Sequence, residues 1–191
     1  MDIISKGMKS KESKSNIYGE IRQAQPFDRP ERELAVVILR TGDVLHHSVD
    51  RALASWGLSN EQYNALRILR GAGEAGHPTL EISRRLISRS PNITRLLDKL
   101  VAKGLARRDR DAQDRRQAVI RITPKGSELL GKCDGAVHAV VAKLRVLSAS
   151  EMKATVGFLD RVRASVAVTT VVEGLRGKEK ARNPEKHERR T

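Results

Sequence analysis

The sequence predicts a mainly α-helical fold that carries one small β-hairpin. Two long stretches, about residues 31–55 and 124–147, place apolar side chains three or four positions apart, as amphipathic helices do. Two shorter helices follow each other closely between residues 79 and 104, and the apolar spacing then changes to two between residues 105 and 123. With 191 residues, the chain suffices for one domain with its own core but is too short for a multidomain enzyme.

The first 28 residues are rich in Lys and Ser and show no sustained period, so we expect a mobile arm, with a short helix possible at Ile17–Ile21. From Glu31, the periodicity predicts a helix of about 24 residues that ends at Trp56-Gly57. The next helix has a clear start, because Ser59 and Gln62 form a capping box and Leu58 can pack against Tyr63.

Two short helices follow. Thr79 is expected to cap the first, which covers Leu80 to Leu86. After a three-residue break, Ser90 is expected to cap the second, with Pro91 at the first helical position, where its missing N–H costs nothing. This second helix ends at Gly104, and its buried stripe comprises Ile93, Leu96, Leu97, Leu100 and Val101. Two helices joined by so short a turn predict a helix-turn-helix.

The segments Leu105–Arg110 and Gln117–Thr123 predict two strands, joined by a polar loop at 111–116. A hairpin directly after a helix-turn-helix is a wing. Thr123-Pro124 begins another long helix of about 23 residues, and Ser148 with Glu151 forms a second capping box for a last helix through Val166. Residues 171–191 are expected to be a charged, disordered tail.

The charge balance favours a polyanionic partner. Thirty-seven Lys and Arg against 23 Asp and Glu give a formal charge of +14 and a pI of about 10.5. Residues 84–125 hold 13 basic and 4 acidic residues, a surplus of nine, so the positive charge is concentrated in the helix-turn-helix and wing. Nucleic acid is the leading candidate and an anionic membrane surface the second, although a merely solvated basic face would give the same count. Too few aromatic residues are present for stacking on single strands, which favours duplex DNA.

The order of these elements resembles the MarR family of winged-helix transcription regulators over about residues 31–166. The strongest matches are the block from Arg89 to Leu105, then Asp114-Arg115-Arg116, then the run from Ile122 to Gly126. The resemblance implies an arm at 1–28, a MarR-like domain at 29–170 and the tail at 171–191. Within that domain, the winged helix-turn-helix covers about 59–124 and dimerisation helices about 31–55 and 124–168. It also implies a homodimer and a small, often aromatic or anionic effector bound between these helices and the winged part.

The second short helix would enter the major groove by its N-terminal turn. Asn92 suits adenine and Arg95 suits guanine by bidentate hydrogen bonding, while Ser90 and Thr94 lie beside them. Ser90 can equally be only a cap, and Arg95 only a surface arginine. Arg84, Arg85, Arg89 and Lys99 fit phosphate contacts.

In the wing loop, Arg115 and Arg116 are placed to reach a minor groove. The resemblance favours Arg116 as the inserted side chain. It also implies that Asp114 orients the arginine by an ion pair, although a turn-forming role would explain Asp114 as well.

Nothing in the sequence supports an enzyme, a cofactor or a metal site. Cys133 falls on an apolar stripe and is read as a buried, inert thiol rather than a nucleophile. The histidines His46, His47, His77 and His138 show no ligand-like spacing. One cysteine, no apolar signal core and no ~20-residue apolar run lead us to expect a cytoplasmic protein without a membrane span.

The sequence therefore predicts a homodimeric, sequence-specific duplex DNA-binding regulator, most often a repressor, that occupies a pseudo-palindrome and is released by an effector. The alternative is an architectural protein that binds DNA with little sequence preference. A winged helix used only for protein contacts fits poorly with the concentrated positive charge.

Overall fold

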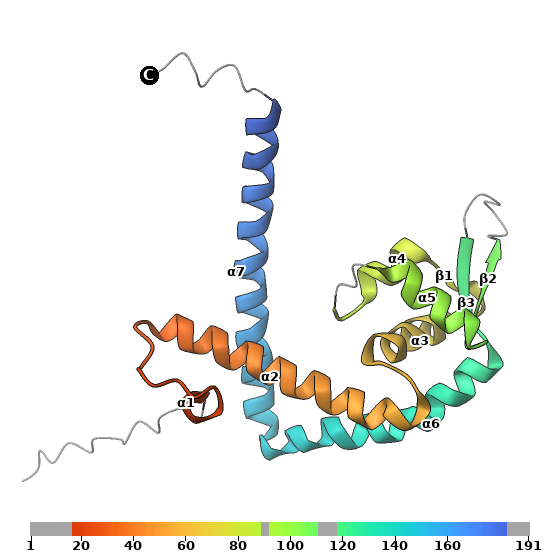
Figure 1. Ribbon diagram of the computed structural model, residues 1–191, viewed down its shortest axis with the longest axis horizontal. Coiled ribbons are helices and arrows are strands. Elements are labelled where there is room, and N and C mark those ends of the chain that lie inside the picture. Colours follow the sequence, from red (N-terminus) through yellow and green to blue (C-terminus); the bar gives the residue numbers. More distant parts are fainter. Residues whose placement is uncertain (1–16, 89–91, 111–117, 183–191) are drawn as a thin grey trace, which may run out of the picture. The chain divides into compact units, whose positions relative to one another are not determined.

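The computed structural model describes residues 17–88, 92–110 and 118–182 (Figure 1). It divides into two compact units between Val140 and Val141. Within the described residues, no helix is both long and apolar enough to cross a bilayer. The elements are α1 (Ile17–Glu20), α2 (Pro30–Leu53), α3 (Asn60–Ala72), β1 (His77–Pro78), α4 (Thr79–Arg85), α5 (Ile93–Ala102), β2 (Ala106–Arg110), β3 (Ala118–Ile122), α6 (Pro124–Val141) and α7 (Ala149–Arg182).

The N-terminal segment is more ordered than a mobile arm over the part that is described. The expected short helix forms as α1, and the Tyr18 hydroxyl donates to Glu33 of α2 at 2.9 Å. The Tyr18 and Phe27 rings lie 5.4 Å apart, and Arg40 pairs with Glu20 at 3.3 Å. Aromatic packing and these two polar contacts therefore fold residues 17–28 back onto the first half of α2, which low hydropathy alone did not reveal.

Helix α3 begins as its sequence predicts. Ser59 Oγ accepts the Gln62 N–H at 3.3 Å, and Gln62 Oε1 accepts the Ser59 N–H at 3.3 Å, which completes the capping box. Helix α4 differs: Thr79 is its first helical residue, and the cap position is held by Pro78 in extended backbone, without a side-chain bond. The reason is that His77 and Pro78 are already engaged as strand β1, so the helix starts directly where the strand ends.

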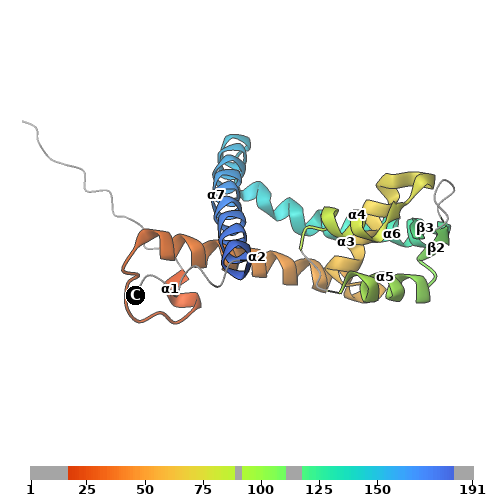
Figure 2. The ribbon, with the colours of Figure 1, turned by 90° about the horizontal axis from the view of Figure 1, so that it is seen from above.

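Helices α3, α4 and α5 gather beside the C-terminal end of α2 around one core (Figure 2). The largest buried side chains of this core are all apolar, and each has no exposed area: Leu53, Leu66, Leu69, Ile82, Leu97, Leu100, Ile120 and Leu130. Burial of this many branched side chains is the main stabilising contribution to the winged part of the chain.

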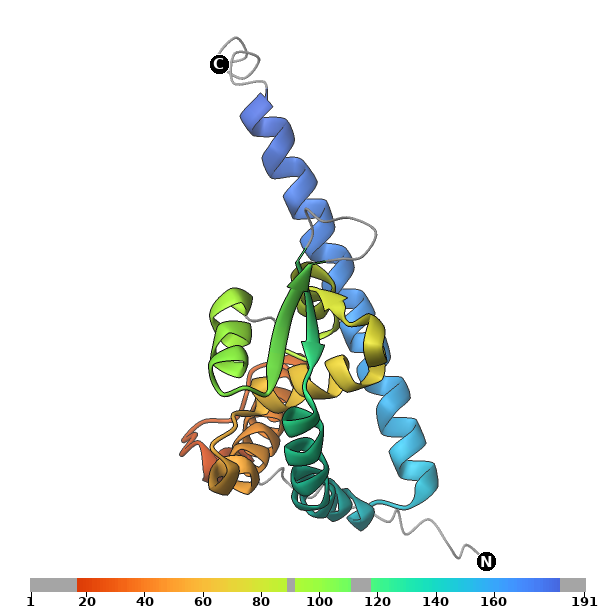
Figure 3. The same ribbon diagram turned by 90° about the vertical axis from the view of Figure 1, so that its right-hand side faces the viewer.

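The sheet has three antiparallel strands in the order β1-β3-β2, one more than expected (Figure 3). Strand β2 pairs with β3 from Ala106 opposite Ile122 to Arg110 opposite Ala118, as the two predicted strands require. Strand β1 adds His77 opposite Ile120 and Pro78 opposite Val119. A two-residue strand has no detectable period of its own, so the sequence could not predict it.

The start of α6 explains the run Thr123-Pro124-Lys125-Gly126. Thr123 Oγ accepts the Gly126 N–H at 3.0 Å and donates to the Gly104 carbonyl at 2.7 Å, so it caps α6 and ties it to the end of α5. Pro124 occupies the first helical position. A Cβ on Gly126 would overlap the Leu105 carbonyl, so only glycine fits there.

A polar clip joins α6 to α3. The Tyr63 hydroxyl donates to Asp134 at 2.8 Å, and Arg70 donates to the other carboxylate oxygen at 2.7 Å. Partial burial opposes ionisation of Asp134, but the hydrogen bonds from Arg70 and Tyr63 outweigh it and lower the pKa of this carboxyl. Burial, together with the bond to the Asp134 carboxylate, raises the pKa of Tyr63 to about 12.

The second unit consists mainly of α7. The Ser148–Glu151 capping box forms, with the Ser148 N–H donating to Glu151 at 2.8 Å and the Glu151 N–H donating to Ser148 Oγ at 3.3 Å. Helix α7 runs 34 residues to Arg182, past the predicted end near Val166 and into the expected tail. Straight-chain charged residues have good helix propensity, so loss of the apolar stripe does not by itself end a helix.

Candidate nucleic-acid interface

Helix α5 carries the predicted recognition surface, but it begins later than expected. Asn92, not Ser90, is the cap: its side-chain oxygen accepts the Arg95 N–H at 3.2 Å, and Ile93 is the first helical residue. Asn caps as well as Ser does, because its short side chain reaches the free N–H groups of the first turn. The predicted positions Arg89, Ser90 and Pro91 lie outside the described residues.

The two faces of α5 have opposite characters. Leu97 and Leu100 have no exposed area, and Ile93, Leu96 and Val101 pack partly buried against the same core. Asn92, Thr94, Arg95 and Lys99 are all exposed. The predicted stripe therefore anchors the helix, and the predicted DNA-contacting side chains point away from the core.

The structure separates basic side chains that are paired within the chain from those that are not. Arg85 donates to Glu81 at 2.6 Å on α4, and this hydrogen bond lowers the pKa of Glu81. Arg108 of β2 pairs with Asp98 of α5 at 2.8 Å. In the described part of the chain, no ion pair involves Arg84, Arg95 or Lys99. These three side chains are therefore the strongest described candidates for contacts with DNA.

Two lysines in the basic block serve the fold instead. Lys103 Nζ donates to the Gly57 carbonyl at 2.5 Å, and Lys125 Nζ donates to the Lys103 carbonyl at 3.0 Å. The surplus of nine charges in residues 84–125 therefore overstates the charge that is free to meet a partner.

Asp109 and Arg121 form a partly buried contact that the sequence did not lead us to expect. Arg121 Nη1 lies 3.0 Å from Asp109 Oδ2, and Arg107 Nε lies 3.3 Å from the same oxygen. The strand register contained the signal, because Arg107 lies directly opposite Arg121 and two like charges in that position repel. An acid two residues along the same strand face is what relieves the repulsion.

The wing loop is the least characterised part of the predicted site. Asp114, Arg115 and Arg116 lie outside the described residues, so their predicted roles stay predictions. The described strands β2 and β3 bring the two ends of this loop together beside α5 (Figure 3).

Among the described residues, His46 and Cys133 are engaged within the fold rather than gathered into a metal site. No group of three or more His, Cys, Asp or Glu side chains there is able to hold a metal ion. His46 instead pairs with Asp50 at 3.2 Å and Glu61 at 3.5 Å. Cys133 has no exposed area, and burial raises the pKa of its thiol, which disfavours the reactive thiolate.

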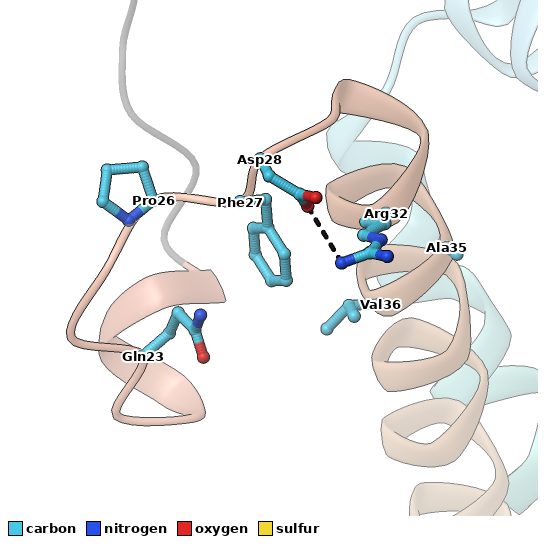
Figure 4. A pocket seen from close by; sticks show the side chains of 7 residues that line it. All are labelled: Gln23, Pro26, Phe27, Asp28, Arg32, Ala35 and Val36. Carbon is cyan, nitrogen blue, oxygen red and sulfur yellow. Dashed lines mark ion pairs between the residues drawn. The ribbon is translucent and has the colours of Figure 1, made fainter.

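Two cavities lie along α2. The larger, of about 560 Å³, is lined by Phe27 and neighbouring residues of the N-terminal segment and by Ala35 and Val36 of α2, with the Asp28–Arg32 ion pair at 3.1 Å beside it (Figure 4). The smaller has a volume of about 10 Å³ and lies among His46, residues 60–64 of α3 and the segment 86–88 before α5.

Comparisons with protein families, curated proteins and solved structures all match this chain to transcription regulators. The model of the MarR family matches residues 58–118. The HTH-type transcriptional regulator TtmR of Methylorubrum extorquens (strain PA1) is 41% identical over 98 residues, which are 49% of each chain. The match thus spans about half the length of this curated relative.

Solved structures match over more of the chain. A MarR transcription factor from Planctomyces limnophilus is 31% identical, with a TM-score of 0.54, over 71% of this chain and 98% of that one. The MepR–DNA complex of S. aureus is 24% identical, with a TM-score of 0.64, over 69% of this chain and 96% of that one, and shares the fold.

Proposed function

This chain belongs to the MarR family, and from that premise we propose that it is a sequence-specific regulator of transcription that binds double-stranded DNA as a homodimer. The observation that carries the proposal is the division of α5 into a fully buried face and an exposed face bearing Thr94, Arg95 and Lys99. A helix held this way can lie in a major groove without disturbing its own core. A regulator acts where the chromosome is, so the proposal includes a cytoplasmic location.

We assign the side chains by their chemistry. Arg95 reads guanine and Ser90 and Thr94 add contacts in the same groove, while Arg84, Arg85, Arg89 and Lys99 contact phosphates. Arg115 and Arg116 enter the neighbouring minor groove, with Asp114 orienting them. Asn92 reads adenine, and its side-chain oxygen, which already accepts the Arg95 N–H, has a second lone pair with which to accept from the base.

The dimer is supported by apolar side chains that the single chain leaves exposed. On α2 these are Leu34, Leu39 and Val44, which are 52%, 73% and 48% exposed. On α7, Val156 and Phe158 are 58% and 57% exposed. Surfaces of this kind mark protein contacts. A symmetric dimer places two α5 helices on half-sites about 10 base pairs apart.

We extend the proposal to repression that a small effector relieves. The cavity between α2 and the winged part has about 10 Å³ of space, room for no more than one water molecule. Asn64 Oδ1 accepts the Ile87 N–H at 2.9 Å beside it. A ligand can enter there only in a conformer in which this cavity is open. It therefore binds the open conformer more tightly than the closed one, and this difference in affinity is what a switch requires. The pocket beside Phe27 already has the volume of a small-molecule site, so a ligand there would need no conformational change to make room.

The test is selection from a randomised duplex library at ~150 mM salt with the full chain, followed by sequencing of the retained DNA. The proposal predicts an enriched inverted repeat with half-sites about one helical turn apart. Retention without enrichment would overturn it in favour of an architectural protein that coats DNA.

Two variants then separate base reading from phosphate contact. Arg95→Ala should reduce the ratio of operator to random-DNA affinity by about tenfold, since a bidentate contact is worth about 1–3 kcal/mol. The matched variant Lys99→Ala should weaken binding to both DNAs equally and reduce the salt slope by about 1.8, because each of the two protomers loses one phosphate contact. Unchanged discrimination in Arg95→Ala would refute its reading role.

A further inference from the structure

The stem of the wing, formed by β2 and β3, contains a partly buried ion pair that joins its two strands. The side chains of Arg121 and Asp109 are 18% and 28% exposed, the lowest pair of values among the ion pairs of the described residues. Asp109 Oδ2 receives both Arg121 at 3.0 Å and Arg107 at 3.3 Å, so one carboxylate neutralises two opposed arginines. A pair this enclosed is screened less by salt than a surface pair is.

Arg121 also reaches beyond the hairpin. Its Nε donates to the Glu74 carbonyl at 2.6 Å, in the turn that follows α3. One guanidinium therefore joins both strands of the wing to the end of α3. Its planar fork makes two differently directed bonds at once, which a lysine ammonium does not reproduce.

The backbone of this turn lies unusually close to the stem. Gly76 has a φ of +64°, and a Cβ there would lie 2.5 Å from the Ile120 carbonyl oxygen and 2.6 Å from Arg121 Cγ. The next residues, His77 and Pro78, pair with β3. On the other edge of the sheet, Arg108 of β2 pairs with Asp98 of α5. The stem is thus fixed on both sides, to α3 and to the recognition helix.

We propose that Asp109 and Arg121 are positioning residues for DNA binding, which fix the direction in which β2 and β3 leave the domain relative to α5. They act on DNA through the hairpin and touch no DNA themselves. A stem held in advance does not have to be ordered on binding, and that ordering would otherwise reduce affinity. The inference rests on the proposed function, because it concerns how a DNA-binding wing is held.

The direction in which Asp109→Asn changes the affinity for DNA tests the proposal. Asp109→Asn keeps the shape of the side chain, removes a negative charge and leaves two arginines unneutralised. By charge alone, it should bind DNA more tightly. Positioning predicts the opposite: at least a fivefold rise in the Kd for the selected operator at ~150 mM salt, with hydroxyl-radical protection lost in the minor groove flanking the α5 site and retained at its centre. A Kd that is unchanged or lower would overturn the proposal.

Glu81→Gln is the matched control, because it removes one negative charge from the same domain and frees Arg85 from an exposed pair on α4. It should bind operator equally well or more tightly. If Asp109→Asn loses its native circular dichroism spectrum, Arg121→Lys replaces it as the test, since it keeps the charge and loses one of the two bonds. The same fivefold rise is expected there, and wild-type affinity would overturn the proposal.

The two proposals fail in different ways. A wild-type chain that enriches no sequence contradicts the proposed function. A wild-type chain that selects an operator, with Asp109→Asn binding it as tightly, contradicts only the positioning role.

Discussion

The winged part of the chain and its long helices differ in how completely they bury their apolar side chains. In the winged part, Ile82, Leu97 and Ile120 have no exposed area at all. On α2, Leu39 is 73% exposed, and on α7, Val166 is 64% exposed. The winged part therefore buries its apolar side chains within the chain, with the C-terminal end of α2 and with α6, whereas the exposed apolar side chains of α2 and α7 need something else to cover them.

This difference shows what apolar periodicity in the sequence does and does not predict. Periodicity identifies an apolar stripe on α5 and on α7 up to Val166, but it does not say whether the same chain covers that stripe. The comparison also separates two measurable quantities: stability that a single chain supplies, and stability that depends on protein concentration.

The largest expected effect tests the self-contained core. Leu97→Ala should lower the free energy of unfolding by about 2–5 kcal/mol, since it removes a fully buried side chain and leaves a cavity. Urea unfolding followed by circular dichroism measures it, and the loss should not change with protein concentration. Leu39→Ala is the matched control: its loss should be small at low concentration and grow as dimer forms. Equal, concentration-independent losses would erase the distinction between the two regions.

Gly76→Ala should lower the free energy of unfolding by about 2–3 kcal/mol, because it combines a left-handed backbone with a Cβ that overlaps β3. Gly73→Ala has almost the same backbone, with a φ of +59°, but open space around the new Cβ. It should cost about 1 kcal/mol. Similar losses in the two variants, measured by thermal and urea unfolding, would show that the close approach at Gly76 is unimportant.

Charge placed on the exposed stripe of α7 should affect assembly rather than folding. Val156→Asp is expected to raise the dimer dissociation constant at least about tenfold, or ~1.4 kcal/mol, in sedimentation equilibrium. Ala164→Asp is the control, since this exposed residue lies on the same helix but away from the faces of Val156, Phe158 and Val166. If both variants dissociate alike, the stripe is not the contact surface.

The smallest effect concerns the clip between α3 and α6. Asp134→Asn should lower the free energy of unfolding by about 1 kcal/mol, a value reduced by solvent screening because the Asp134 and Arg70 side chains are 36% and 42% exposed. The pKa of Asp134 is lowered in the folded chain, so its contribution is complete above the pKa of an unfolded Asp and is lost as pH falls through the folded value.

Unfolding measured from pH 7 down to pH 3 should therefore show the wild type and Asp134→Asn converging. Glu128→Gln provides the comparison, because it breaks a pair with Lys132 whose carboxylate side chain is 68% exposed. It should have almost no effect. A constant gap between wild type and Asp134→Asn across this range would contradict the pKa assignment.

Local chemistry made much of the fold predictable. The capping boxes at Ser59 and Ser148 and the cap at Thr123 involve residues three positions apart, and all three form as expected. The α5 stripe was likewise found from spacing, because burial of one helix face leaves a direct mark on the sequence.

The failures arise where two local signals compete or where the contact is distant in sequence. Ser90 and Asn92 are both good caps two residues apart, and propensity does not choose between them. The pairings of Arg108 with Asp98 and of Arg121 with Asp109 depend on how the hairpin folds against its neighbours, so counting charges overestimated the free arginines. Strand β1 depends in the same way on β3.

Cys133 provides a native reporter on this core. It is the one cysteine in the sequence, it has no exposed area, and it lies in the cluster that joins α3 and α6. A thiol reagent can therefore modify the folded chain only when that cluster opens, and modification at high reagent concentration proceeds at the opening rate itself. The rate of Cys133 modification, followed by mass spectrometry with and without DNA, thus measures how often the core opens in the natural sequence.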